Sequence, residues 1–149
     1  MRHAARAPQT LTDAEVAAIL DATSRAEHDL RDHVLLSLAL GTGLRLTELV
    51  SLNVGDVVNG KGVRGVWELR PETTKGKVGG TIALPDRLRR KVSRFVRWKA
   101  EQGESVDVDA PLFTSRGRGR GAKRSGGRLS ARTAEHIFAA WQVRCGFDR

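Results

Sequence analysis

The chain has 149 residues, of which 26 are lysine or arginine and 17 are aspartate or glutamate, and its formal net charge is +9. This length suits one domain with a sizeable core, and no apolar stretch reaches the roughly 18 residues that a membrane-spanning helix requires. The single cysteine, Cys145, excludes an internal disulfide, and the four histidines show no metal-site spacing. We therefore expect a cytoplasmic protein without metal or cofactor, whose positive charge favours a polyanion, most commonly nucleic acid, as its partner.

Residues 1–10, "MRHAARAPQT", are basic and contain no hydrophobic segment, which excludes a secretory signal and predicts a flexible lead-in. The domain is expected to occupy residues 11–149. It begins with "TDAE", a capping-box pattern in which Thr12 caps a helix that extends to about Ser24. A second helix is predicted through "DHVLLSLAL" to Gly41, and "RLTELVSL" forms a third, short helix.

Two strands are predicted in the middle of the chain. "GVWELR" and "GTIALP" carry β-branched residues and flank the turn-rich "PETTKGKVG", so they pair as antiparallel neighbours, with "DVV" at residues 56–58 as a candidate third strand. A long helix follows from Asp86, with an apolar face opposite basic residues, and "PLF" at residues 111–113 is a buried anchor. Ser130 caps a final helix that contains Trp141. The predicted fold class is α+β, mainly α, with helices packed around a small antiparallel sheet of two to three strands.

The order of these segments resembles the catalytic domain of tyrosine recombinases, the phage integrase family. The resemblance rests on "TGLRLTEL", on a lysine in the hairpin "TTKGKVGGTIALP" and on the helix "LSARTAEHIF", and it spans residues 11–147. It implies an incomplete integrase-like catalytic fold, duplex DNA as the partner, and a place in site-specific recombination and integration by strand breakage and rejoining.

Arg45 of "TGLRLTEL" follows the longest apolar run in the chain. In the family this arginine binds the scissile phosphate, a role that suits the guanidinium because its planar fork matches two phosphate oxygens. Glu48 lies one helical turn further on and is expected to support catalysis by orienting that fork. The alternative is a structural pair between Arg45 and Glu48 that packs a helix end.

Lys75 matches the hairpin lysine of the family, which implies that it is the general acid that protonates the leaving 5′ oxygen. Lys77 is the competing choice for this role, and it is otherwise expected to bind DNA. The alternative for both is that they are ordinary solvated lysines of a turn.

The glycine-rich segment "TSRGRGRGAKRSGGRL" is strongly basic, with seven basic residues and no acidic one between Ala110 and Ala134. If most of them contact phosphates, the logarithm of the binding constant should fall with the logarithm of salt concentration at a slope of about −6. The resemblance adds the start of the last helix as a phosphate-binding site. The DNA-binding residues expected here are Arg116, Arg118, Arg120, Lys123, Arg124, Arg128, Ser130 and Arg132. The alternatives are a solvated loop and an RG-type RNA-binding segment.

The stretch "HDLRDH" at residues 28–33 imitates the H-x-x-R box that supplies the second phosphate-binding arginine of the family. Its position is wrong, because the family's box follows the hairpin and the basic loop. Arg31 also opens the apolar helix and Arg45 lies beyond its end, so about ten helical residues separate them by some 15 Å. We therefore predict that Arg31 belongs to an ordinary charged helix start.

The chain departs from the family in having no tyrosine and no H-x-x-R box after its last helix. We therefore expect the front portion of a catalytic domain, which binds DNA but is not catalytically competent alone. Apolar faces left open, including part of the helix of Trp141, predict self-association, and a full-length recombinase is a further candidate partner. The alternative function is a non-catalytic DNA-binding regulator or accessory module.

Overall fold

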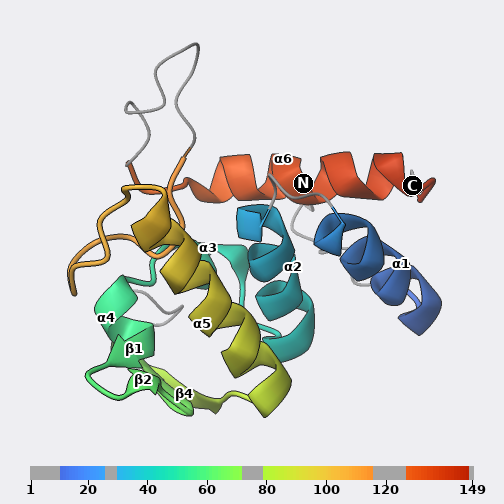
Figure 1. Ribbon diagram of the computed structural model, residues 1–149. Helices are drawn as coiled ribbons and strands as arrows, with labels where there is room; N and C mark the ends of the chain where they lie inside the picture. Colours follow the sequence, from blue (N-terminus) through green and yellow to red (C-terminus); the bar gives the residue numbers. More distant parts are fainter. Residues whose placement is uncertain (1–10, 26–29, 72–78, 116–126, 148–149) are drawn as a thin grey trace.

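The computed structural model describes residues 11–25, 30–71, 79–115 and 127–147, and Figure 1 shows the arrangement of their helices and strands. The expected lead-in, residues 1–10, lies outside these ranges. The elements are α1 (Asp13–Ser24), α2 (Leu30–Thr42), α3 (Leu46–Val50), α4 (Val54–Val57), β1 (Val58–Asn59), β2 (Gly62–Val63), β3 (Val66–Leu69), β4 (Gly80–Ala83), α5 (Asp86–Glu101) and α6 (Ala131–Arg144). The predicted fold class is confirmed, because the chain is mainly helical and its strands form small antiparallel sheets.

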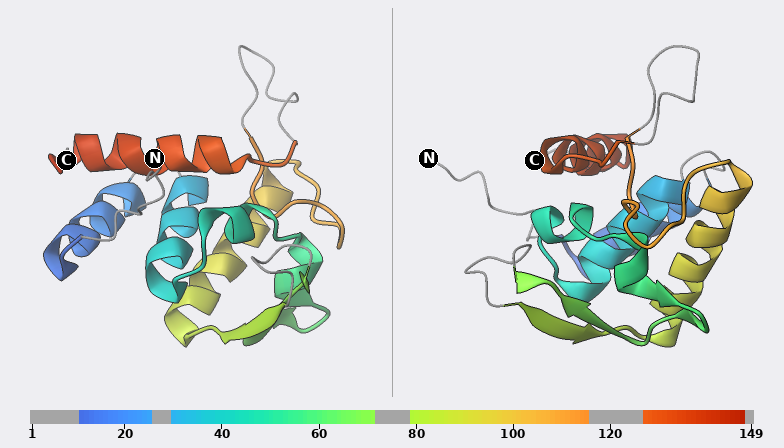
Figure 2. Two further views of the ribbon diagram at one scale, coloured as in Figure 1. Left: turned by 180° about the vertical axis from the view of Figure 1, so that it is seen from behind. Right: turned by 90° about the vertical axis from the view of Figure 1, so that its left-hand side faces the viewer.

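Helix α2 lies at the centre of the molecule, where α1, α3 and α5 pack around it (Figures 1 and 2). Its apolar run is buried on every side, so Val34, Leu35, Leu36 and Leu38 have no solvent exposure. This explains why the run shows no polar face. Helix α5 covers α2 from one side with a strongly amphipathic sequence.

The start of α1 agrees with the sequence prediction, whereas the end of α2 differs from it. The capping box is confirmed: the Glu15 N–H donates to Thr12 Oγ1 at 3.1 Å, and the Thr12 N–H donates to Glu15 Oε1 at 3.0 Å. Gly41, however, does not end α2. The helix continues to Thr42, and Gly43 adopts the left-handed conformation that reverses the chain, with φ of 76°. Gly41 instead permits close packing, because a Cβ there would lie 3.0 Å from Leu88 Cδ1.

The predicted strand pair is confirmed, and the third strand is placed differently. Strands β3 and β4 are antiparallel, with Trp67 opposite Ile82 and Leu69 opposite Gly80, and Trp67 is fully buried on the inner face. The stretch "DVV" does lead into a strand, β1, but this strand pairs with β2 in a separate two-stranded sheet. The tight turn after Asn59 returns the chain onto β1, so the edge of β3 receives no strand from it.

The carboxyl-terminal part of the described chain contains the predicted buried anchor. Leu112 and Phe113 have no exposure, and the backbone around them bonds on both sides: the Leu112 N–H donates to the Leu52 carbonyl, and the Leu129 N–H donates to the Phe113 carbonyl. Residues 110–115 therefore connect α3 with the start of α6. None of the described helices is long and apolar enough to cross a membrane.

Helix α6 closes a second, smaller apolar cluster in which Phe138 and Trp141 pack against Ile19 of α1 and Leu36 of α2. The expectation that part of the Trp141 helix is left open is confirmed for Val143, which is 59% exposed, whereas Trp141 itself is only 5% exposed.

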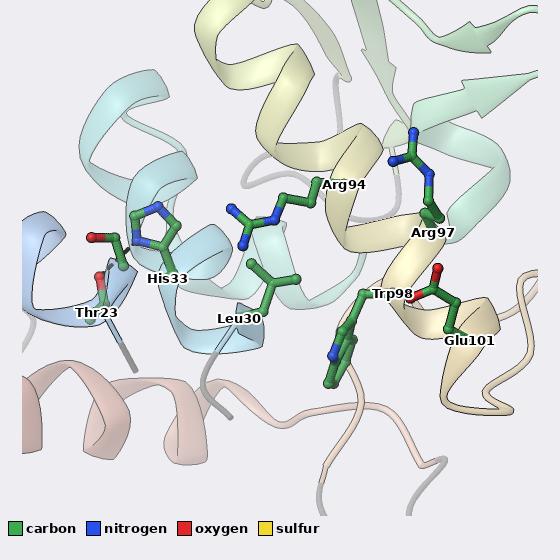
Figure 3. A pocket seen from close by; sticks show the side chains of 8 residues that line it. Thr23, Leu30, His33, Arg94, Arg97, Trp98 and Glu101 are labelled. Atoms are coloured by element: carbon green, nitrogen blue, oxygen red, sulfur yellow. Dashed lines mark hydrogen bonds between the residues drawn. The ribbon is translucent and has the colours of Figure 1, made fainter. Parts of the chain in front are cut away.

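A pocket of about 310 Å³ opens where α1, α2 and α5 meet, and Figure 3 shows it from close by. Leu30 and Trp98 contribute apolar surface to its lining, and His33 and Arg94 contribute nitrogen atoms.

Candidate functional site

Arg45 occupies the N-cap position of α3, immediately after the chain reverses at Gly43. Leu44 and Leu46 on either side of it are partly buried and pack against the main core, whereas Arg45 itself is exposed. No described residue forms a hydrogen bond or ion pair with its guanidinium. The backbone of Arg45 is thus anchored in the core while its side chain remains available to a ligand.

Glu48 acts on this site in a different way from the one expected. Its Oε1 accepts the backbone N–H of Arg45 at 2.9 Å, so the carboxylate closes the first turn of α3. The structure shows no bond from Glu48 to the guanidinium fork. Glu48 therefore fixes where the main chain of Arg45 begins the helix, and its expected role in orienting the fork stays a prediction.

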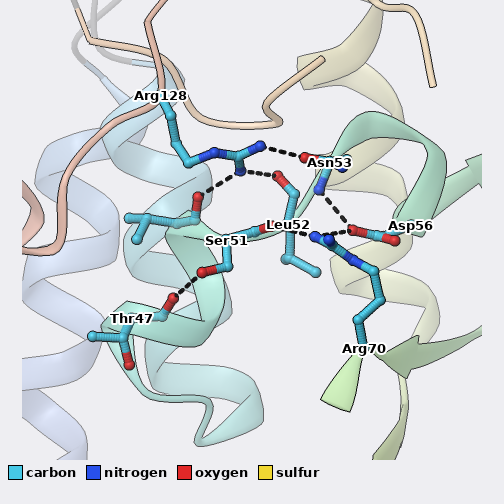
Figure 4. Close-up of polar contacts among 8 residues, drawn as sticks. Thr47, Ser51, Leu52, Asn53, Asp56, Arg70 and Arg128 are labelled. Atoms are coloured by element: carbon cyan, nitrogen blue, oxygen red, sulfur yellow. Dashed lines mark hydrogen bonds and ion pairs between the residues drawn. The ribbon is translucent and has the colours of Figure 1, made fainter. Parts of the chain in front are cut away.

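Arg128 is also placed differently from the expectation that it contacts DNA phosphates. Its Nη1 donates to the carbonyls of Val50 at 2.9 Å and Leu52 at 3.1 Å, and its Nη2 donates to Asn53 Oδ1 (Figure 4). These carbonyls are left without helical partners where α3 ends. Burial lowers the pKa of Arg128, as does the positive charge of Arg70, whereas Asp56 raises it. Arg128 is thus engaged within the chain, and we remove it from the set of free phosphate ligands.

A second arginine completes this network. Arg70, just after β3, donates from Nη2 to the Ser51 carbonyl at 2.6 Å and to Asp56 Oδ2 at 3.1 Å, and the same carboxylate oxygen accepts the Asn53 N–H at 2.7 Å (Figure 4). The network joins the end of α3 to α4, to β3 and to the segment before α6, which contains Arg128. The sequence contained a signal for part of it, because "NVGD" has the asparagine-to-aspartate spacing of a capping box.

Ser130 is confirmed as the N-cap of α6, since its Oγ accepts the Thr133 N–H at 3.0 Å. Arg132 lies in the first turn and is exposed, and no described residue pairs with it. Helices α3 and α6 pack against each other. The two exposed arginines, Arg45 and Arg132, therefore stand at the amino-terminal ends of two helices that pack against each other.

The remaining predicted site residues lie outside the described ranges. These are Lys75, Lys77, Arg116, Arg118, Arg120, Lys123 and Arg124. The described residues on either side of the basic loop are joined, because the Ser115 N–H donates to the Gly127 carbonyl at 2.8 Å, directly before α6. The end of β3 and the start of β4, which are paired, lie on the same side of the molecule as α3 (Figure 2, right). Within the described ranges, no three His, Cys, Asp or Glu residues are grouped as metal ligands.

Arg31 is buried, so the prediction of an ordinary charged helix start was wrong. Its Nε and Nη2 donate to Asp32 Oδ1 at 3.1 and 2.9 Å, its Nη1 donates to the Thr114 carbonyl at 3.1 Å, and Asp32 Oδ2 accepts the Trp141 Nε1–H at 3.0 Å. Each of the three guanidinium nitrogens of Arg31 thus donates to an acceptor inside the fold. This agrees with the prediction that "HDLRDH" supplies no phosphate ligand.

The amino-acid sequence of the chain is similar to those of known tyrosine recombinases. The chain is 25% identical over 144 residues to tyrosine recombinase XerC of Actinobacillus pleuropneumoniae serotype 7 (strain AP76), covering 96% of this chain and 41% of that protein. It is 24% identical over 153 residues to tyrosine recombinase XerA of Pyrococcus furiosus (strain ATCC 43587 / DSM 3638 / JCM 8422 / Vc1), covering 95% and 50%. The chain thus spans two fifths to one half of the length of these relatives.

The fold is similar to the crystal structure of XerA recombinase, with a TM-score of 0.69 and 18% identity over 93% of this chain and 44% of that one. The sequence matches the phage integrase family over residues 9–149, which includes every site residue discussed above. The chain therefore belongs to the phage integrase family.

Proposed function

We propose that the chain binds duplex DNA through phosphate contacts around Arg45, as the DNA-binding part of a tyrosine recombinase catalytic domain. The observation that carries this proposal is the geometry of Arg45: its main chain is fixed by Glu48, and its guanidinium is exposed and unpaired among the described residues. A guanidinium so placed can donate two parallel N–H bonds to one phosphate. It would also stabilise the charge that builds up on a phosphate under attack.

Further phosphate contacts would come from neighbouring groups. Ser130 and Arg132 at the start of α6 are exposed and lie in an element that packs on α3. The basic loop would add Arg116, Arg118, Arg120, Lys123 and Arg124. In this proposal Lys75 or Lys77 approaches the leaving 5′ oxygen as general acid. Such contacts hold the backbone of any sequence, so the chain would show little sequence preference and would associate with the nucleoid in the cell.

We further propose that the chain does not cleave DNA alone. The relatives are named tyrosine recombinases, and this chain contains no tyrosine, so a covalent phosphotyrosyl bond would need a tyrosine from another polypeptide. A nicked suicide substrate should leave no covalent adduct on the isolated chain. An adduct that survives denaturing electrophoresis would contradict this part of the proposal.

DNA binding is tested by fluorescence anisotropy with a labelled 20-base-pair duplex at several salt concentrations. The wild-type slope of log binding constant against log salt should be about −6, and Arg45→Ala should reduce its magnitude by about 0.9, the contribution of one phosphate. Arg45→Lys keeps the charge and should restore the slope without restoring the full affinity, because the fork is lost. Arg25→Ala, which removes an exposed arginine of α1 paired with Asp21, is the matched control and should leave binding unchanged. An unchanged slope in Arg45→Ala would refute the proposed contact.

A non-catalytic accessory role is the second candidate, favoured by the absence of tyrosine from the chain. The two roles differ in complementation by a separate fragment that carries an H-x-x-R box and a tyrosine. A recombinase part should regain strand cleavage with that fragment and lose it in Arg45→Ala, whereas an accessory module should occupy the site without cleavage.

Competition between the duplex and a structured RNA at fixed salt tests whether the RG segment prefers RNA. Light scattering tests self-association.

A further inference from the structure

Helix α5 carries a row of arginines that the proposed DNA contacts do not use. Arg87, Arg90, Arg94 and Arg97 follow one another at intervals of three, four and three residues, so they share one face of the helix. All four are exposed, while the opposite face, with Leu88, is buried in the core. No described residue forms an ion pair with any of the four.

This arginine face points away from Arg45. Helix α5 lies in front in Figure 1, whereas α3 lies in front after the turn of 180° in Figure 2. In the view turned by 90°, α2 stands between α3 and α5 (Figure 2, right). A duplex held at α3 and at the start of α6 would therefore leave the arginine face of α5 exposed.

The arginine face runs into the pocket between α1, α2 and α5. Arg94 extends toward His33, Leu30 lies between His33 and Trp98, and Glu101 lies beyond Trp98 in the lining of the pocket (Figure 3). Arg97 points away from His33 toward the sheet side of α5. Trp98 is held in place because its ring stacks on Phe95, with 5.9 Å between the centroids. The pocket thus combines a cation, an imidazole and an apolar wall.

We propose that the arginine face and this pocket bind an acidic segment of a partner protein, which places one apolar side chain in the pocket. Charge complementarity supports an acidic occupant. From Arg87 to Arg97 the helix rises by about 15 Å, which an extended peptide covers with about five residues. Two or three carboxylates on such a segment can each meet a guanidinium, in bidentate geometry where the spacing permits.

The pocket favours a peptide over a second nucleic acid. A volume of about 310 Å³ with an apolar wall suits one side chain, whereas a phosphodiester backbone presents no apolar group to fill it. The carboxylate of Glu101 in the lining can accept a peptide N–H, which a phosphodiester backbone does not offer. The proposal does not depend on DNA binding by Arg45.

The test uses fluorescein-labelled peptides of twelve residues in which aspartates and serines alternate around a single central leucine. A second peptide replaces the leucine with serine, and a third replaces the aspartates with asparagines. Binding is measured by anisotropy at constant salt, with wild-type protein, with Arg90→Glu/Arg94→Glu and with Arg45→Glu. The last variant makes the same kind of charge change on the opposite side. Thermal unfolding of each variant establishes that it is folded.

The expected result is that Arg90→Glu/Arg94→Glu raises the Kd of the leucine peptide at least tenfold and that Arg45→Glu raises it less than twofold. The leucine peptide should bind at least fivefold more tightly than the serine peptide, and the asparagine peptide should not bind measurably. Equal effects of the two charge reversals, equal affinity of the leucine and serine peptides, or a wild-type Kd above 1 mM would each overturn the proposal. The labelled duplex is titrated in parallel. If Arg90→Glu/Arg94→Glu weakens duplex binding as much as Arg45→Glu does, this face binds nucleic acid and the peptide proposal is wrong.

Discussion

Asp32→Asn should destabilise the folded chain by about 3–5 kcal/mol, because it leaves a buried arginine without its counter-charge. The side chains of Arg31 and Asp32 are only 10% and 9% exposed. Water therefore cannot solvate the Arg31 guanidinium when the negative charge of Asp32 is removed. Both carboxylate oxygens are used, Oδ1 by two donors of Arg31 and Oδ2 by the indole N–H of Trp141. Asparagine offers one acceptor oxygen and places an amide donor against the other partner.

The loss is measured by urea denaturation followed by tryptophan fluorescence. At roughly 2–4 °C per kcal/mol for a chain of this size, the midpoint of thermal unfolding should fall by about 6–20 °C. The control is Asp21→Asn, which breaks an exposed pair with Arg25 on the surface of α1 and should cost less than about 1 kcal/mol. Both substitutions remove one charge and keep the shape of the side chain.

A double variant separates the buried charge from simple loss of packing. Arg31→Met/Asp32→Leu removes both charges, so its cost should be smaller than that of Asp32→Asn and should reflect mainly the unpaired Trp141 N–H, about 1–3 kcal/mol. The reasoning is refuted if Asp32→Asn costs less than about 1 kcal/mol, or if the double variant is less stable than the single one.

Three further substitutions test other parts of the structure by the same denaturation. Burial lowers the pKa of His33 from 6.5 to about 4, with smaller contributions from nearby Lys91 and Arg94. The unfolded chain therefore binds the proton more tightly than the folded chain. Neutral His33 should contribute on the order of 3 kcal/mol to the free energy of unfolding; this contribution is fully present above pH 6.5 and is lost as the pH falls toward 4. His33→Gln should remove this part of the pH dependence of stability. Arg128→Ala should cost about 1–2 kcal/mol, since two carbonyls at the end of α3 lose a charged donor, and Arg128→Lys should recover only part of it. Gly55→Ala should cost about 1–3 kcal/mol, because the new Cβ would lie 2.9 Å from the backbone oxygen at residue 108, whereas Gly60→Ala meets open space and should be nearly neutral.

The parts of the fold that were predictable from the sequence are those fixed by neighbours along the chain. The Thr12–Glu15 capping box and the Ser130 cap each involve residues three positions apart, and the β3–β4 pair is defined by its alternating pattern. Gly41 was misassigned because glycine has two uses, a left-handed turn and close packing, and only the position of Leu88 decides between them. The pairing of the third strand depended in the same way on a contact made after the chain turns.

In the candidate site, too, positions set by sequence neighbours could be predicted, whereas contacts between distant segments could not. The position of Arg45 at the start of a short helix could be predicted from a local motif, since Glu48 and the flanking leucines create it, and its role as a phosphate ligand stays a prediction. Arg128 and Arg31 could not be assigned, because their carbonyl partners lie 78 and 83 residues away in the sequence. The sequence alone predicts a phosphate ligand at Arg128 and an ordinary charged helix start at Arg31, whereas the guanidinium of each bonds to a main-chain carbonyl far away in the sequence. Composition of a basic segment therefore identifies a partner of opposite charge but does not say which of its arginines are free to meet it.

The described arginines differ in what their guanidinium groups contact. Arg31, Arg70 and Arg128 donate to main-chain carbonyls, Arg31 and Arg70 donate also to a carboxylate, and each of the three joins segments that are distant in the sequence. Arginines of this kind stabilise the fold, and their charge is already compensated or directed at carbonyl dipoles. The exposed arginines at the start of α3 and along α5 have no such partners among the described residues, so their charge is available on two opposite sides of α2. Because the buried part of α2, Val34 to Leu38, lies between the two sides, a ligand on one of them need not exclude a ligand on the other.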